Sequence, residues 1–162
     1  MDYDYLTGIL TYDKDTGFFR WMKTRSRTAM VNEVAGTLKD NGYLQIQINR
    51  KAYYAHRLAW FYVNREWPPH DVDHVNGCRT DNRIENLRCA TRKQNTFNSS
   101  IRSNNTSGVK GVSWNKRKNK WEAYCAKDGK RRNIGLFDCI EEARKSVEKE
   151  RMSLHGVFYN NG

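Results

Sequence analysis

The chain has 162 residues, of which 12% are aromatic, so we expect one ordinary domain or two small ones with packed cores rather than a disordered tail. Its 29 Lys and Arg side chains outnumber 18 Asp and Glu, and the formal charge of +11 indicates a polyanionic partner, either a nucleic acid or an anionic membrane surface. No apolar run approaches the roughly 18 residues of a membrane-spanning helix, and residues 1–4 lack a signal-peptide pattern, which disfavours the membrane.

The first predicted elements are two strands and a helix. Residues 43–48 alternate between apolar and polar side chains, which predicts a strand, and residues 49–51 should turn the chain toward a second strand. Residues 56–62 have helix-compatible spacing, and the two prolines at 68–69 should end that helix.

A strand, a loop, a second strand and a helix are predicted next. The strands are residues 72–75 and 86–89, joined by a polar loop that contains an Asn-Gly turn signal. Thr91 and Gln94 have the Thr-x-x-Gln spacing of a capping box, so a helix should begin there.

These predicted elements carry side chains that could bind a metal ion or take a proton. With Thr91 as N-cap, Asn95 lies in the first helical turn, and two strands packed on that helix can bring Asp73 and His74 against it. Oxygen atoms of Asp and Asn suit a hard divalent cation such as Mg²⁺, and His is the usual side chain to take a proton near neutral pH. A metal, a base and a basic surface together indicate phosphodiester hydrolysis.

The surrounding sequence resembles the HNH (ββα-metal) family, specifically its homing-type endonucleases of phage origin, in which Asn replaces the last His. The resemblance covers roughly residues 5–99 and rests on Asp73-His74, on Asn86 twelve residues after the His, on Asn95 nine residues further, and on the flanking text DNRIENLR and QNTFN. It implies that Asp73 and Asn95 bind one Mg²⁺ or Mn²⁺ ion, that His74 is the general base, and that Asn86 holds His74 in register.

Other polar side chains in this region have more than one interpretation. His56 lies in the family text HRLAW, and its commonest interpretation is a helix-start residue packed against the fold. Arg57, Arg79, Arg83 and Arg88 are candidate phosphate contacts, with a solvated basic face as the equal alternative.

The four cysteines, at positions 78, 89, 125 and 139, form no CxxC pair. That spacing favours reduced thiols in a cytoplasmic protein and disfavours a structural zinc site.

A polar, turn-rich run at residues 101–108 is interpreted as a linker. It separates a first domain, residues 1–100, from a second, residues 109–157. The first domain should be the nuclease module and the second a smaller basic module.

The second domain should be a three-stranded sheet packed on one helix. The predicted strands are residues 109–114, 120–127 and 131–137, and Asp138 with Glu141 resembles a helix N-cap with its partner. The apolar stripe that should pack on the Trp121 face of the sheet comprises Ile140, Ala143, Val147 and Leu154.

This module resembles the APETALA2/ethylene-response-factor DNA-binding domain, through the elements KGV, KW, IGLF and EEA in order. In that family the exposed face of the sheet reads bases in the major groove. The resemblance therefore implies DNA contacts from Lys110, Ser113, Asn115, Lys120, Tyr124, Arg131 and Asn133. Ser113, Ala126 and Asn133 stand where the plant domains carry Arg or Trp, so the plant target sequence does not carry over, and binding through phosphates alone stays an alternative.

Together these features predict an α+β protein, a metal-dependent endonuclease that a C-terminal module directs to double-stranded DNA. The expected protein is phage-encoded, acts in the host cytoplasm as a monomer or weak homodimer, and has one active site per chain, which favours nicking. A non-catalytic DNA-binding regulator with a relic HNH domain and an RNA-binding or RNA-cutting protein are the alternatives. The complete set of Asp73, His74 and Asn95 favours the enzyme.

Overall fold

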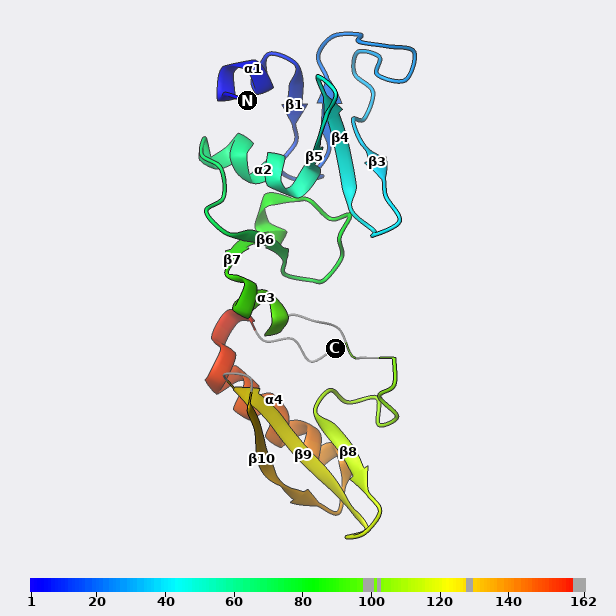
Figure 1. The fold of residues 1–162 in the computed structure, drawn as a ribbon, viewed down its shortest axis with the longest axis vertical. Helices are drawn as coiled ribbons and strands as arrows, with labels where there is room; N and C mark the ends of the chain where they lie inside the picture. Colours follow the sequence, from blue (N-terminus) through cyan, green and yellow to red (C-terminus); the bar gives the residue numbers. More distant parts are fainter. Residues whose placement is uncertain (98–100, 102, 128–129, 159–162) are drawn as a thin grey trace. The chain divides into compact units, whose positions relative to one another are not determined.

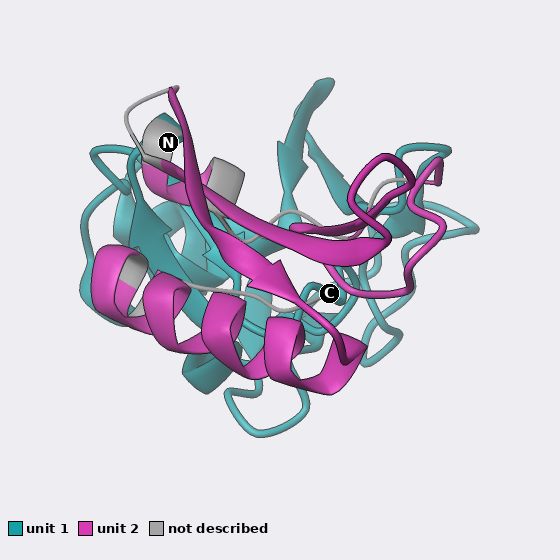
Figure 2. Ribbon diagram, turned by 90° about the horizontal axis from the view of Figure 1, so that it is seen from below, with its two compact units in different colours: residues 1–92 teal, residues 93–162 magenta. Residues whose placement is uncertain are grey.

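A computed structural model describes the chain except for residues 98–100, 102, 128–129 and 159–162 (Figure 1). The chain divides into two compact units, residues 1–92 and 93–162 (Figure 2). Each unit contains a hydrophobic core. The predicted α+β class is confirmed, while the domain limits at residues 100 and 109 stay a prediction. Within the described residues, no helix is long and apolar enough to cross a membrane.

Unit 1 begins with a short helix, a two-stranded sheet and a three-stranded sheet (Figure 1). The elements are α1 (Tyr3–Thr7), β1 (Leu10–Tyr12), β2 (Phe19–Trp21), β3 (Thr37–Leu38), β4 (Leu44–Ile48) and β5 (Lys51–Tyr54). The strand predicted over residues 43–48 is confirmed as β4, which lies between β3 and β5. Ile46 and Ile48 of β4 are buried and Gln47 between them is exposed, so the strand has one core face and one solvent face.

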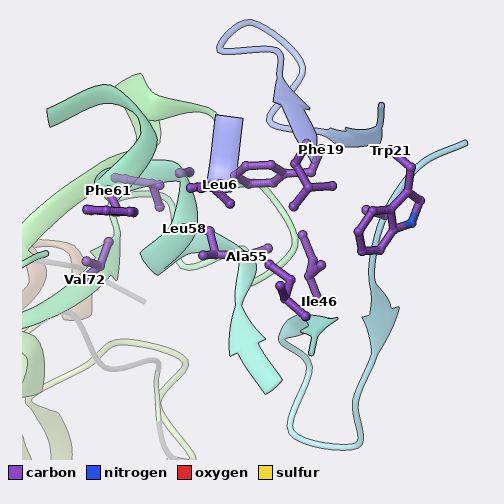
Figure 3. Close-up of a cluster of buried hydrophobic side chains, with 13 residues drawn as sticks. Leu6, Phe19, Trp21, Ile46, Ala55, Leu58, Phe61 and Val72 are labelled. Atoms are coloured by element: carbon purple, nitrogen blue, oxygen red, sulfur yellow. The ribbon is translucent and has the colours of Figure 1, made fainter. Parts of the chain in front are cut away.

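Helix α2 (Ala55–Asn64) supplies the centre of the core of unit 1. Leu58 is fully buried, and Figure 3 shows it gathered with Leu6 and Ile46 in the apolar cluster. The helix ends at Asn64, before the prolines that were predicted to end it. Arg65 adopts a left-handed conformation with φ of 61°, and its N–H donates to the carbonyl of Phe61.

The predicted order of strand, loop, strand and helix is confirmed by the next elements. They are β6 (Asp71–His74), the 3₁₀ turn η1 (Ile84–Asn86), β7 (Leu87–Ala90) and α3 (Arg92–Phe97). Strands β6 and β7 pair antiparallel, with Asp73 opposite Arg88. Helix α3 begins directly after Thr91, and the division between the units falls inside it, after Arg92.

Unit 2 contains the predicted antiparallel sheet and helix (Figure 1). The elements are β8 (Val112–Asn115), β9 (Lys120–Lys127), β10 (Lys130–Phe137), α4 (Ile140–His155) and η2 (Gly156–Phe158), with β9 in the middle of the sheet. Strand β8 begins three residues later than predicted because Gly111 has φ of 78°. A Cβ atom at Gly111 would lie 2.5 Å from the carbonyl oxygen of Tyr124, so only glycine fits this approach.

The core of unit 2 lies between α4 and one face of the sheet. Ala143 and Val147 of α4 are buried against Val112 and Ala123, and Ile140 and Trp121 pack at the edge of this cluster. The predicted packing is thus confirmed for three residues of the apolar stripe, while that of Leu154 stays a prediction. The predicted helix cap is wrong. The N-cap is Cys139, without a side-chain hydrogen bond, because the helix starts at Ile140 and the Asp138 carboxylate instead pairs with Lys120 at 3.0 Å.

The buried position of Leu58 leads to a stability prediction for unit 1. Leu58→Ala should lower the free energy of unfolding by about 2–5 kcal/mol, because it leaves a cavity in the core. Leu38→Ala is the matched control, since Leu38 is 59% exposed and its loss should change stability by less than about 0.5 kcal/mol. Urea unfolding followed by circular dichroism measures both, and equal losses would contradict this account of the core.

Candidate active site and nucleic-acid face

His74 occupies the end of β6 and is 3% exposed. Its Nε2 atom lies 3.1 Å from Oδ1 of Asn82, and its ring centroid lies 5.0 Å from that of His56 and 5.9 Å from that of Tyr43. Burial lowers the pKa of His74, while the hydrogen bond to Asn82 acts in the opposite direction. The imidazole is thus a fixed, mainly uncharged group at neutral pH.

Asp73 precedes His74 on β6 and is 7% exposed. Arg88, directly across the hairpin on β7, donates to its Oδ2 atom from Nε at 2.9 Å and from Nη2 at 2.8 Å. Because both side chains are largely buried, removing either partner would leave an uncompensated charge in the protein. The structure therefore assigns the Arg88 guanidinium to Asp73, whereas its predicted contact with a phosphate stays a prediction.

Asn86 acts on the loop that follows His74. Its Oδ1 atom accepts from the backbone N–H of Asn76 at 3.0 Å, and its Nδ2 atom donates to Oδ1 of Asn76 at 3.0 Å and to the carbonyl of Asp81 at 2.8 Å. The carbonyl of Asn86 also accepts from the N–H of Val75 at 2.8 Å. These bonds tie both ends of the loop to the end of η1.

Asn82 is the residue at this site that sequence analysis missed. It is 1% exposed, and its Nδ2 atom donates to the carbonyl of Thr80 at 3.2 Å while its Oδ1 atom faces His74. From the sequence it belongs to a polar loop, where asparagine is common. The available signal was its place inside the DNRIENLR text that carries the family resemblance.

His56 is the second residue of α2 and is 6% exposed, as expected for a residue near the helix start that packs against the fold. Its ring stacks on Tyr54 at 5.5 Å, and within the described residues its buried Nδ1 atom has no hydrogen-bond partner. Burial, with smaller contributions from His74 and Arg57, lowers the pKa of His56 to about 3. His56 is therefore neutral at physiological pH.

Asn95 lies on α3, beyond the division between the units. A metal site formed by Asp73 and Asn95 therefore stays a prediction. Among the residues that the structure describes, no cluster of three or more His, Cys, Asp or Glu side chains is placed to hold a metal ion. The predicted pair, one carboxylate and one amide, is a smaller donor set than such a cluster.

The remaining basic candidates in unit 1 contact other parts of the protein. Arg83 forms ion pairs with Asp81 and Glu85, each at 2.8 Å. Arg57 donates to the carbonyl of His70 at 3.1 Å, beside an open pocket of about 460 Å³. Roles for these arginines as phosphate contacts stay a prediction.

The sheet of unit 2 presents one polar face away from α4. Tyr124 lies opposite Asn133 and Asn115 lies opposite Lys120, so these side chains share a face with Ser113. The Arg131 guanidinium lies 3.8 Å from the centre of the Tyr124 ring. Six of the seven predicted DNA contacts therefore share this face.

Lys110 has a different position from the other predicted contacts. It precedes β8 and lines a pocket of about 190 Å³ together with Arg151 of α4. Burial and the neighbouring Arg151 lower the pKa of Lys110 to about 8. Lys110 thus lies next to the helix, and its contact with DNA stays a prediction.

Glu122 lies at the centre of the polar face, opposite Ser113. Its carboxylate lies 3.4 Å from Nη2 of Arg131 and accepts from the amides of Asn115 and Asn133, each at 3.5 Å. One acidic side chain thus orients three of the predicted DNA contacts.

The segment that contains the hairpin, the Asp-His pair and α3 matches a known family. Residues 53–97 match the family model described as HNH endonuclease, and the chain belongs to this family. It is 33% identical over 109 residues to Protein 3.8 of Escherichia phage T7, and the alignment covers 67% of this chain and 89% of that protein. No solved structure matches the chain. The resemblance of unit 2 to the APETALA2 domain stays a prediction.

The lowered pKa of His56 leads to a prediction about acid stability. The pKa is about 3 in the folded protein and near 6.5 in the unfolded chain. Between these values only the unfolded chain binds the proton, so stability that is fully present above pH 6.5 is lost as the pH falls toward 3. His56→Phe should remove about 2 kcal/mol of the stability lost between pH 6.5 and pH 5.

Urea unfolding at pH 7 and pH 5 measures this difference. His70→Phe is the control, because His70 is exposed and its replacement should leave the pH dependence as in the wild type. The same pH dependence in His56→Phe and in the wild type would refute the assignment.

Proposed function

We propose that the chain is a metal-dependent DNA endonuclease in which His74 is the general base and Asp73 and Asn95 hold one Mg²⁺ or Mn²⁺ ion. The observation that carries the proposal is the buried, fixed His74 next to the Asp73 carboxylate, within the segment that matches the HNH family. A neutral imidazole with one protonated nitrogen has a lone pair for a proton of water at neutral pH.

The donor set fits a hard divalent cation. Asp73 is a carboxylate that already accepts a cationic group, the guanidinium of Arg88, and Asn95 offers an amide oxygen. When bound, such an ion supplies Lewis-acid stabilisation of charge on the scissile phosphate and the leaving oxygen. The arginine at Asp73 also limits the net negative charge that the site presents to a DNA phosphate.

In the proposed hydrolysis, His74 transfers a proton and Asn86 has a structural role. His74 takes a proton from water, the water oxygen bonds to phosphorus, and the bond from phosphorus to the 3′ oxygen breaks. The 3′ oxygen takes a proton from solvent and His74 returns its proton to solvent, so the products carry a 5′-phosphate and a 3′-hydroxyl. Asn86 keeps the loop after His74 in place during this exchange.

Unit 2 is proposed to locate the DNA through the polar face of its sheet. Arg131 is stacked on Tyr124, and Asn115 and Asn133 are oriented by Glu122, so these donors are fixed before any base edge arrives. Two weakly binding modules on one chain raise each other's effective concentration on the same DNA. We further propose a phage homing-type or site-specific nicking enzyme, a monomer or weak homodimer that acts on double-stranded DNA in the host cytoplasm.

Cleavage of supercoiled plasmid tests the enzymatic proposal. Wild-type protein with Mg²⁺ should give relaxed or linear DNA, and His74→Ala should lower the rate by about 10²- to 10⁴-fold while gel-shift affinity is unchanged. His70→Ala, which removes an exposed histidine, should cleave as the wild type does.

The alternative function has a distinct outcome in the same assay. If the wild type binds DNA but leaves plasmid and source-genome fragments intact across Mg²⁺, Mn²⁺ and other divalent metals, the chain is a DNA-binding regulator. Competition by double-stranded RNA as effective as by DNA would point to an RNA-directed protein.

The sheet face leads to a separate prediction about affinity. Arg131→Ala should weaken binding to double-stranded DNA about 5- to 150-fold and reduce the dependence of binding on salt, because a charged contact is lost. Arg144→Ala removes the same charge from α4, where Arg144 pairs with Glu141 at 2.8 Å, and should change affinity much less. Fluorescence anisotropy across salt concentrations measures both, and equal losses would exclude the sheet face as the interface.

A further inference from the structure

We infer that Asn82 is a positioning residue that sets the tautomer of His74, and that the N-terminal hairpin of β1 and β2 holds Asn82 for this task. The catalytic consequence rests on the proposed role of His74 as general base. The first observable, the ring nitrogen of His74 that carries hydrogen, does not depend on that role.

The direction of the hydrogen bond follows from the partners of the Asn82 amide. Its nitrogen lies 3.2 Å from the carbonyl oxygen of Thr80, which can only accept. The amide must therefore point its NH₂ group at Thr80 and its Oδ1 atom at His74. Since Oδ1 can only accept, Nε2 of His74 carries the hydrogen, and in the neutral ring the lone pair is on Nδ1.

The N-terminal hairpin contacts the backbone of Asn82 and of its neighbour Arg83. The Tyr12 hydroxyl on β1 donates to the Asn82 carbonyl at 2.7 Å. Gly17, in the loop between β1 and β2, has φ of 75°, and a Cβ atom there would lie 2.5 Å from the backbone nitrogen of Arg83. The hairpin backbone thus packs directly on residues 82–83. Both Tyr12 and Gly17 lie outside residues 53–97, the part that matches the family model.

A neutral amide suits this role better than a carboxylate. Asn82 orients the ring and stabilises the Nε2 hydrogen, and this hydrogen bond strengthens when His74 takes a second proton and becomes an imidazolium. The amide oxygen has no affinity for the proton itself, so the proton gained from water stays on Nδ1. A buried amide thereby fixes which nitrogen acts as the base.

Nuclear magnetic resonance of the wild-type protein with ¹⁵N-labelled histidine tests the inference directly. Ring nitrogens that carry hydrogen and those that do not have well-separated shifts, and comparison with His74→Ala assigns the signals of His74. We expect the Nε2–H tautomer at neutral pH. The Nδ1–H tautomer would overturn the inference, whatever the nuclease assay shows.

Two substitutions then separate positioning from folding. Asn82→Leu keeps a branched side chain of slightly larger volume and removes the acceptor. The Nε2–H preference should be lost and kcat should fall about 10- to 100-fold, less than when the base is removed, with KM nearly unchanged. Asn82→Asp keeps an acceptor toward Nε2 and should restore the tautomer. Asn64→Leu, which removes an amide that donates to the Trp60 carbonyl at the end of α2, is the control.

The nuclease proposal and the inference about Asn82 would fail with different experimental results. If the wild type shows the expected tautomer but never cleaves DNA, the nuclease proposal fails and the positioning contact stands. If DNA is cleaved and Asn82→Leu retains the tautomer and kcat, the inference about Asn82 fails and the nuclease proposal stands. Tyr12→Phe should weaken the Nε2–H preference without abolishing it, and this measurement needs no loss of the buried amide.

Discussion

The register of the β6–β7 hairpin is the constraint on which the site depends. It places Asp73 opposite Arg88 and His74 opposite Leu87, so the carboxylate meets its guanidinium inside the protein. A slip by one residue would move every side chain of the strand to the other face and leave a buried charge without its partner. The loop held by Asn86 prevents that slip at the end of the strand, and the site therefore inherits its geometry from the backbone pairing.

Local signals in the sequence were sufficient for the elements that carry this geometry. Alternation predicted β4, and the cap at Thr91 predicted the start of α3, because each signal acts within a few residues. Contacts between distant residues gave no local signal. Asn82 faces His74 and Tyr12 holds Asn82 across 70 positions, and neither contact leaves a pattern in residue spacing.

The predicted cap at Asp138 failed for a physical reason. It treated a charged side chain as if its nearest sequence neighbours decided its partner. In the structure Asp138 pairs with Lys120, eighteen positions away, and Glu122 contacts Arg131 on the next strand. Charges on short strands find their partners across the sheet, because those side chains lie closer than the next residues along the strand.

The count of 29 Lys and Arg side chains overstates the number of cationic groups that are free to meet DNA. Arg88 and Arg83 pair with acidic side chains of the hairpin, and their charges are balanced before any phosphate approaches. His56, in contact with His74, is neutral as well, so the groups that position the base add little net charge. We therefore attribute the chemistry to orientation by neutral and paired groups, and the excess positive charge of the chain to its attraction for DNA.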